Sequence, residues 1–151
     1  MSAASARRRS AVDESFFNRY LEAWNAHDVE AMLEFFTDDA VYEDVALSRA
    51  NQGKEQIREF FEELFKAFPD FRLEDRASAL IGENGRYALE WTMSATHHGD
   101  LPILPATHKH WAVRGTSLGE VEGEKIKRNS DYWNMADFLV QVELLPPLPA
   151  G

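Results

Sequence analysis

Cysteine is absent from the sequence of 151 residues. Its absence excludes disulfide bonds, thiolate-bound zinc, iron–sulfur clusters and cysteine nucleophiles. Long hydrophobic runs are also missing, because no segment approaches the roughly 18 consecutive apolar residues that span a bilayer. The first ten residues contain no apolar stretch of the kind that a secretory signal peptide needs. The sequence therefore predicts a cytoplasmic protein with no membrane partner.

Basic residues are scarce relative to acidic ones. The chain has 16 Lys and Arg against 26 Asp and Glu, which gives a formal net charge of −10. A surface of this sign repels phosphate backbones and anionic membranes. The sequence also lacks the Gly-rich loops, GxGxxG and GxxxxGKS/T, that hold nucleotide phosphates. We therefore expect a small-molecule substrate, and not nucleic acid, as the partner.

Hydrophobic residues are plentiful. They make up 44% of the chain, and aromatic residues make up 12%, including four Trp and ten Phe. This composition suffices for a packed core and an aromatic-lined cavity in one domain. We predict a single domain over residues 11–146, with a disordered N-terminal tail at 1–10 and a C-terminal tail at 147–151.

The order of hydrophobic patterns predicts helices first and strands afterwards. Apolar residues at helical spacing predict a helix from residue 11, a short second helix capped by Asp28, and a third helix between Gly53 and Pro69. Alternating or β-branched patterns predict strands at 40–47, 71–81, 86–98, 108–118 and 125–133, and a short helix follows at 135–145. An acidic turn is expected at 120–124. This order is typical of an α+β fold.

Several short segments, in their order and spacing, resemble the SnoaL-like polyketide cyclases of the NTF2-like superfamily. The resemblance extends from about Phe16 to Pro146, and it implies an NTF2-like, cystatin-like cone: a curved antiparallel sheet around a cavity, closed by the N-terminal helices. The segments are YLEAWNAHD at 20–28, FTDDAVY at 36–42, GKEQIR at 53–58, AFPD at 67–70, THHG at 96–99, GEKI at 123–126 and QVELLP at 141–146. The sequence departs from the family's pattern at Ser130, at Asn134 and in the polar segment at 115–117. The resemblance therefore leaves the substrate and the reaction open.

The resemblance implies a role for Asp131, six residues after Lys125 on the last strand. In the cyclases a carboxylate there removes a proton from a carbon between carbonyls, and the enolate closes a ring by intramolecular aldol addition without metal or cofactor. Burial beside aromatic residues would raise the pKa of this group toward neutrality. Residue types alone favour the alternative, in which Asp131 is a surface residue or pairs with Arg128.

The resemblance also implicates His97, which matches the family's Thr-His-x-Gly segment and would bind a substrate carbonyl or orient Asp131. The alternative is a core histidine. His98 is expected on the opposite face of the strand. Tyr42 and Asp44 alternate on one strand face, where Tyr42 could donate to an enolate and Asp44 could be a second acid.

Other residues are candidates for substrate binding. Arg114 could stabilise an oxyanion, or it could form a salt bridge on the sheet surface. Trp24, Trp91, Met93 and Trp133 are candidate cavity-wall residues, although plain core packing would suit them as well. His108 and His110 share a strand face but lack supporting ligands, so no metal is expected.

These residues predict a cofactor-independent cyclase or isomerase for a polyketide-like carbonyl substrate, acting as a homodimer through its sheet. One alternative is an epoxide-opening enzyme that uses Asp44, Asp131 and Arg114. The other is a non-catalytic ligand-binding or protein-interaction module, in which Asp131 would be exposed or held in an ion pair.

Overall fold

The computed structural model describes residues 12–75, 79–102 and 104–149. The predicted N-terminal tail at 1–10 and the last two residues of the predicted C-terminal tail lie outside these ranges. The helices are α1 (Glu14–Asn25), α2 (Val29–Leu33), α3 (Gly53–Ala67) and α4 (Met135–Gln141). The strands are β1 (Phe36–Asp44), β2 (Arg49–Gln52), β3 (Arg72–Asp75), β4 (Leu80–Ile81), β5 (Arg86–Thr96), β6 (His110–Glu122) and β7 (Lys125–Trp133).

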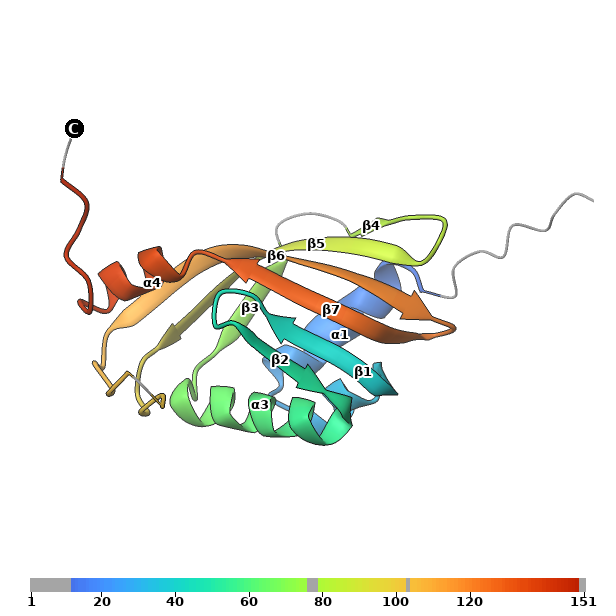
Figure 1. Cartoon of the computed structure of the whole chain (residues 1–151), viewed down its shortest axis with the longest axis horizontal. Coiled ribbons are helices and arrows are strands. Elements are labelled where there is room, and N and C mark those ends of the chain that lie inside the picture. The colour runs from blue at the N-terminus through green and yellow to red at the C-terminus, as the bar shows by residue number, and fades with distance from the viewer. Residues whose placement is uncertain (1–11, 76–78, 103, 150–151) are drawn as a thin grey trace, which may run out of the picture.

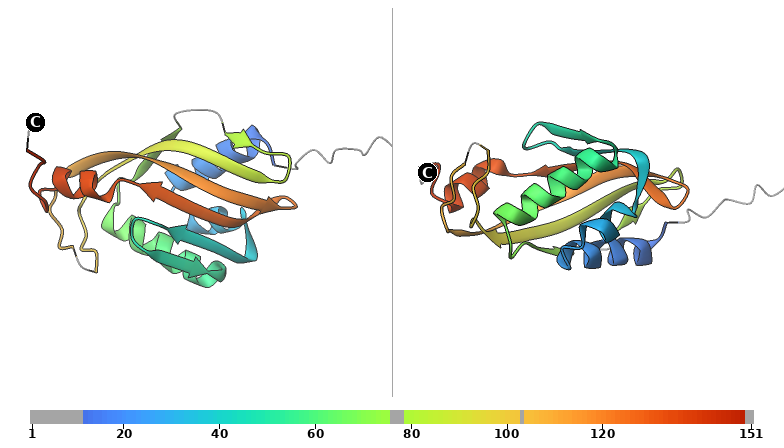
Figure 2. Two further views of the ribbon diagram at one scale, coloured as in Figure 1. Left: turned by 45° about the horizontal axis from the view of Figure 1, so that its top comes forward. Right: turned by 90° about the horizontal axis from the view of Figure 1, so that it is seen from below.

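The strands form one curved sheet in the order β2-β1-β7-β6-β5-β3, and β4 pairs with β5. All neighbouring strands are antiparallel except β1 and β7, which run parallel. Helices α1 and α3 lie along one face of the sheet, and α4 lies at the end of β7 (Figures 1 and 2). The architecture is the α+β fold that the sequence patterns predicted, with the curved sheet of the NTF2-like cone that the resemblance implied.

Side-chain caps fix the beginnings of three helices. The Asp13 carboxylate accepts a hydrogen bond from the Phe16 N–H at 3.0 Å, and Asp28, the predicted cap, accepts one from the Ala31 N–H at 3.1 Å. At α4 the cap is Asn134, whose side-chain oxygen accepts from the Asp137 N–H at 3.0 Å. Each cap satisfies a backbone donor that the helix itself leaves free.

The structure corrects two predicted boundaries and adds one strand. Helix α2 ends at Leu33, and β1 already begins at Phe36, because the Phe35 carbonyl accepts the Ile126 N–H of β7 at 2.8 Å. Strand β2 was not predicted at all, since its four residues are polar or small and lie at the sheet edge. Strand β6 continues to Glu122, so the expected acidic turn is mostly strand.

The core lies between the sheet and the helices and is rich in aromatic side chains. Phe36, Phe61, Met32, Ile57 and Ile126 are fully buried there. No helix in the described part of the chain is long and apolar enough to cross a membrane.

Candidate functional site

A cavity of about 450 Å³ opens between the concave face of the sheet and the helices. Its wall is largely apolar. The predicted wall residues Trp24, Trp91, Met93 and Trp133 all line it, as do Tyr42, Asp44 and Asp131. The structure thus brings seven of the nine sequence-predicted site residues to one cavity.

Asp131 is buried in this cavity, with 7% of its surface exposed. Its carboxylate accepts hydrogen bonds from Ser117 Oγ at 2.6 Å, from Asn129 Nδ2 at 2.9 Å and from the Tyr42 hydroxyl. Burial raises the pKa of Asp131 to about 6, against the lowering effect of these donors. A carboxyl group with this pKa can take up a proton closer to neutral pH than an exposed aspartate can.

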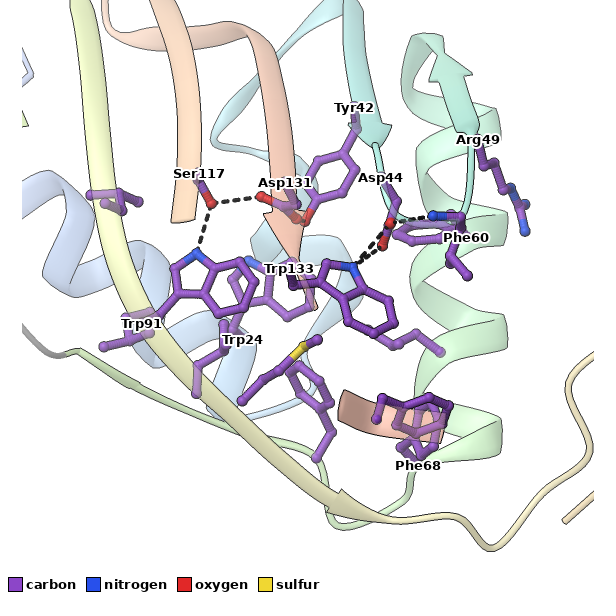
Figure 3. A pocket seen from close by; sticks show the side chains of 18 of the residues that line it. Trp24, Tyr42, Asp44, Arg49, Phe60, Phe68, Trp91, Ser117, Asp131 and Trp133 are labelled. Carbon is purple, nitrogen blue, oxygen red and sulfur yellow. Dashed lines mark hydrogen bonds between the residues drawn. The ribbon is translucent and has the colours of Figure 1, made fainter. Parts of the chain in front are cut away.

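The donors to Asp131 are themselves held by a second set of hydrogen bonds. Trp91 Nε1 donates to Ser117 Oγ at 2.8 Å, and the Tyr87 hydroxyl donates to Asn129 Oδ1 at 2.7 Å. Figure 3 shows the chain of contacts from Trp91 through Ser117 to Asp131. These bonds fix the orientation of the carboxylate, as a positioned general base requires.

Two glycines of β6 make this arrangement possible. A Cβ atom at Gly115 would lie 2.3 Å from the Trp91 ring, and one at Gly119 would lie 2.4 Å from the Tyr87 hydroxyl. The rings of β5 can therefore lie across β6 only because these positions have no side chain.

Gly115, Ser117 and Gly119 match the Gly-x-Ser-x-Gly pattern of a hydrolase nucleophile elbow, and Ser117 was not among the predicted site residues. An elbow is a sharp strand-to-helix turn, whereas these residues lie in the middle of β6. Ser117 donates to Asp131, not to a histidine. Ser117 is a hydrogen-bond partner of the candidate base. Its position two residues after Gly115, on the inward face of the strand, is the sequence feature that could have identified it.

Asp44 lies opposite Asp131 in the register of β1 and β7. Trp133 Nε1 donates to both carboxylate oxygens at 3.0 and 3.1 Å, and the Leu47 N–H donates to Oδ1 at 2.9 Å. Burial raises the pKa of Asp44 despite these bonds. The cavity therefore holds two carboxylates with weakened acidity side by side.

The structure does not bring Arg114 to the cavity. Its side chain is 65% exposed and forms a salt bridge with Glu90 at 3.2 Å. Trp111 and Val113 of the same strand are buried, so the alternation of strand side chains turns Arg114 outward. The structure therefore places Arg114 away from the cavity, in a salt bridge on the sheet surface with Glu90 of β5 and not with a glutamate of the 120–124 segment.

His97 is fully buried, but it does not line the cavity. Its ring packs against Phe68 and Phe138, and its Nδ1 lies 3.2 Å from Thr107 Oγ1. Burial lowers the pKa of His97, which keeps the ring neutral. It contacts neither Asp131 nor the cavity space beside it, whereas His98 is exposed as expected.

Arg49 is a basic residue of the cavity rim that the sequence analysis missed. It donates to Glu63 of α3 at 2.6 Å, and its guanidinium lies 5.0 Å from the centre of the Phe60 ring. Its position follows from β2, which was not predicted. Among the described residues no three His, Asp or Glu side chains come together as a metal site.

Comparison with known proteins identifies the family of this chain. A family model for SnoaL-like polyketide cyclases matches residues 15–142. The chain belongs to this family. Among curated relatives, cyclase aurE of Calcarisporium arbuscula is 28% identical over 117 residues, which cover 76% of this chain and 82% of aurE.

Solved structures show the same fold. AclR of Streptomyces galilaeus, a hydroxylase candidate, is 24% identical and superposes with a TM-score of 0.77 over 93% of this chain and 87% of its own. A protein of Catenulispora acidiphila with a ketosteroid isomerase-like fold is 20% identical, with a TM-score of 0.75 over 87% of this chain and 95% of its own. At these low identities, the likeness to the two solved structures shows that this chain has the same fold.

Proposed function

We propose that the protein is a cofactor-independent cyclase or isomerase of a polyketide-like carbonyl substrate, with Asp131 as the general base. One observation carries the proposal: a buried carboxylate lines an apolar cavity, bonded only to neutral donors. Among the described residues Asp131 forms no salt bridge, and Arg128 pairs instead with Glu120 at 3.3 Å. A purely structural aspartate would be expected to be exposed or ion-paired. Membership of a cyclase family and the similarity to aurE support the same conclusion.

The reaction needs two proton transfers and one new bond. The Asp131 carboxylate removes a proton from a carbon next to a carbonyl, and the electron pair moves to the carbonyl oxygen to give an enolate. The enolate carbon then attacks a second carbonyl of the same molecule, forming a C–C bond. The resulting alkoxide takes the proton back from Asp131, which returns as a carboxylate. In an isomerisation, Asp131 would return the proton to a different carbon.

Tyr42 is placed to assist both transfers. Burial raises the pKa of Tyr42 well above its ordinary value, so the hydroxyl stays protonated and acts as a donor. It bonds Asp131 Oδ2 and would donate to the enolate oxygen when Asp131 is protonated. The aromatic wall excludes water, which strengthens these contacts.

Deuterium exchange tests the proposal. Wild-type protein would be incubated in deuterated water with 1,3-dicarbonyl polyketide esters and ketosteroids, and the mass of the ligand followed. We expect exchange of α-protons by the wild type and at least 100-fold slower exchange by Asp131→Asn, the low end of what general bases contribute. The matched control is Asp39→Asn, the same change at an exposed position of β1. Equal exchange by wild type and Asp131→Asn would refute the role of Asp131.

The in-register pair of Asp44 and Asp131 favours one second candidate, epoxide opening by an activated water molecule. Arg114 lies outside the cavity, so Arg49 at the rim would supply the positive charge that epoxide opening needs. Incorporation of ¹⁸O from labelled water into a cyclic epoxide probe, lost in both Asp44→Asn and Asp131→Asn, would support this reaction over enolisation.

We also infer a homodimer that forms through the outer face of the sheet. Leu118 of β6 and Tyr132 of β7 are large apolar side chains on this face, 42% and 44% exposed. A dimer interface would cover them. Light scattering of the wild type and of Tyr132→Lys tests this inference, and a monomeric wild type would contradict it.

A further inference from the structure

The polar side chains of the sheet meet the cavity at one level of the strands. Ser117 lies opposite Asp131 in the register of β6 and β7, and Asp131 lies opposite Asp44 in that of β7 and β1. Tyr42, on β1, bonds to the Asp131 carboxylate. A carbonyl group of a ligand therefore finds its donors and the candidate base in this one row.

The cavity wall changes in character toward the start of β6. The inward positions before Ser117 are Gly115, Val113 and Trp111, and Trp111 lies opposite Ala95 of β5. Trp111 lies about 20 Å from Ser117 along the strand, because a strand rises roughly 3.3 Å per residue. The Trp111 Nε1 atom is buried within the protein. These inward positions therefore offer a ligand only carbon atoms.

Apolar side chains from the helices close the cavity beside Trp111. The Trp111 ring packs at 5.1 Å from Phe68, which follows α3, and at 5.0 Å from Phe138 of α4. Figure 3 shows Phe68 well separated from Asp131. Three leucines, from α4 and from the segment between β5 and β6, also line the cavity: Leu139, Leu101 and Leu104.

Backbone groups in this region are occupied as well. Leu101 and Leu104 bond each other, N–H to carbonyl, at 2.9 and 3.1 Å. The Ala112 N–H donates to Gln141 Oε1 and its carbonyl accepts from Gln141 Nε2, both at 2.9 Å, which ties α4 to β6 beside Trp111. The described side chains that bound this part of the cavity therefore offer a ligand no nitrogen or oxygen atom. We call it the apolar end.

The opposite end of the cavity is polar. Glu14 and Asn18 of α1 line it and are exposed. Phe17 of the same helix packs at 4.7 Å from the Tyr87 ring, and Tyr87 lies opposite a residue of β6 that comes after Ser117. The row of polar groups thus separates an end that accepts polar atoms from an end that does not.

This asymmetry determines which ligand groups each end favours. A hydroxyl or carbonyl group in the apolar end would lose its hydrogen bonds to water without replacing them. A hydrocarbon group there gains affinity by about fourfold for each buried methylene. The charged rim residues Arg49 and Glu63 bond each other at 2.6 Å, and Glu63 precedes Phe68 by more than one turn of α3. They offer the apolar end no partner.

We propose that the substrate carries an oxygen-free hydrocarbon group next to its carbonyl groups, and that this group lies in the apolar end of the cavity. The substrate class is thus a 1,3-dicarbonyl compound with a reduced tail. A chain that keeps an oxygen on every second carbon would place oxygens in the apolar end and bind poorly. That the dicarbonyl end loses a proton to Asp131 rests on the proposed function; the position of the hydrocarbon group does not.

The test compares two ligands of equal length, methyl 3-oxodecanoate and methyl 9-hydroxy-3-oxononanoate, whose tails end in a methyl and a hydroxyl group. Their binding to the full chain is measured by titration calorimetry. We expect the methyl-ended ligand to bind more tightly by about tenfold or more. Shortening its tail to that of methyl 3-oxobutanoate should weaken binding by about 100-fold or more. Equal binding of the two long ligands, no loss on shortening, or no binding of any would overturn the proposal.

Two variants locate the tail. Leu139→Asn places an amide in the apolar end and should largely remove the preference for the methyl-ended ligand. In the matched control Leu21→Asn, the same change on α1, the preference should persist. A preference that both variants lower equally would place the tail elsewhere. Calorimetry measures no proton transfer, so these results stand apart from the exchange assay: ligands that bind as expected without exchange would refute the proposed function alone.

Discussion

Asp44 and Asp131 lie opposite each other on the parallel strands β1 and β7, and both carboxylates are buried beside the same cavity. Each therefore makes ionisation of the other less favourable. The negative charge of Asp44 contributes to the raised pKa of Asp131, after burial. Loss of the Asp44 charge would therefore lower the pKa of Asp131.

The first prediction concerns this coupling. In Asp44→Asn the neighbouring charge is lost, so the pKa of Asp131 should fall below its value of about 6. The acid limb of the pH profile of kcat/KM for proton exchange should move to lower pH by a few tenths to one unit. An unchanged limb, with Asp39→Asn as the control, would show that Asp44 does not influence the base.

Ser117 should have the opposite effect. Its hydroxyl donates to Asp131 Oδ1 and stabilises the charged form of the carboxylate. In Ser117→Ala this bond is lost, the pKa of Asp131 rises, and the acid limb should move up by about one unit. The pH profile of kcat/KM for proton exchange measures this shift. A limb that moved down, or a loss of activity at every pH with no shift, would contradict the assigned bond.

The buried carboxylate should also cost stability. The folded-state pKa of Asp131 is about 6, above an unfolded value of about 3.9. The contribution of protonated Asp131 to folding stability is thus complete below about pH 4, and it is lost as the pH rises through 6 and the buried group ionises. Asp131→Asn cannot ionise. Relative to wild type it should gain about 2–3 kcal/mol in unfolding free energy between pH 4 and pH 8, measured by urea denaturation at both values. Equal differences at the two pH values would place the pKa of Asp131 near its ordinary value.

Local patterns predicted those parts of the site that depend on strand alternation. Tyr42 and Asp44 share the inward face of β1, and Trp91 and Met93 share that of β5. The family's motif spacing led to Asp131. The same alternation could have excluded Arg114, because the buried Trp111 and Val113 leave it only the outer face.

The parts of the site that the sequence did not predict depend on contacts between residues far apart in the chain. The register of β1 against β7 brings Asp44 beside Asp131, although 87 positions separate them in the chain. His97 is on the expected inward side, yet Phe68 and Phe138 separate it from the cavity. Such contacts depend on how α3 and α4 pack, which no local pattern specifies.

The outward position of Arg114 leads to a negative prediction. In Arg114→Gln the cavity is unchanged, so kcat/KM should stay within about twofold of wild type. The loss of its exposed salt bridge with Glu90 should cost less than about 1 kcal/mol. Exchange assays and urea denaturation check both. A large loss of kcat/KM would place Arg114 in the reaction after all.

A side chain at position 115 should reduce both stability and activity, because it would displace the Trp91 ring. In Gly115→Ala the new methyl group would overlap the Trp91 ring. The ring must move, and its hydrogen bond to Ser117 is lost. We expect a stability loss of about 1–3 kcal/mol and slower proton exchange. In Trp91→Phe the ring atoms that meet the methyl group are absent, so adding Gly115→Ala to that variant should cost less, and the remaining cost comes from the Tyr132 carbonyl oxygen, 2.8 Å from the new methyl group. A double-mutant cycle on unfolding free energy measures this coupling, and additive effects would show that Gly115 matters for a reason other than Trp91.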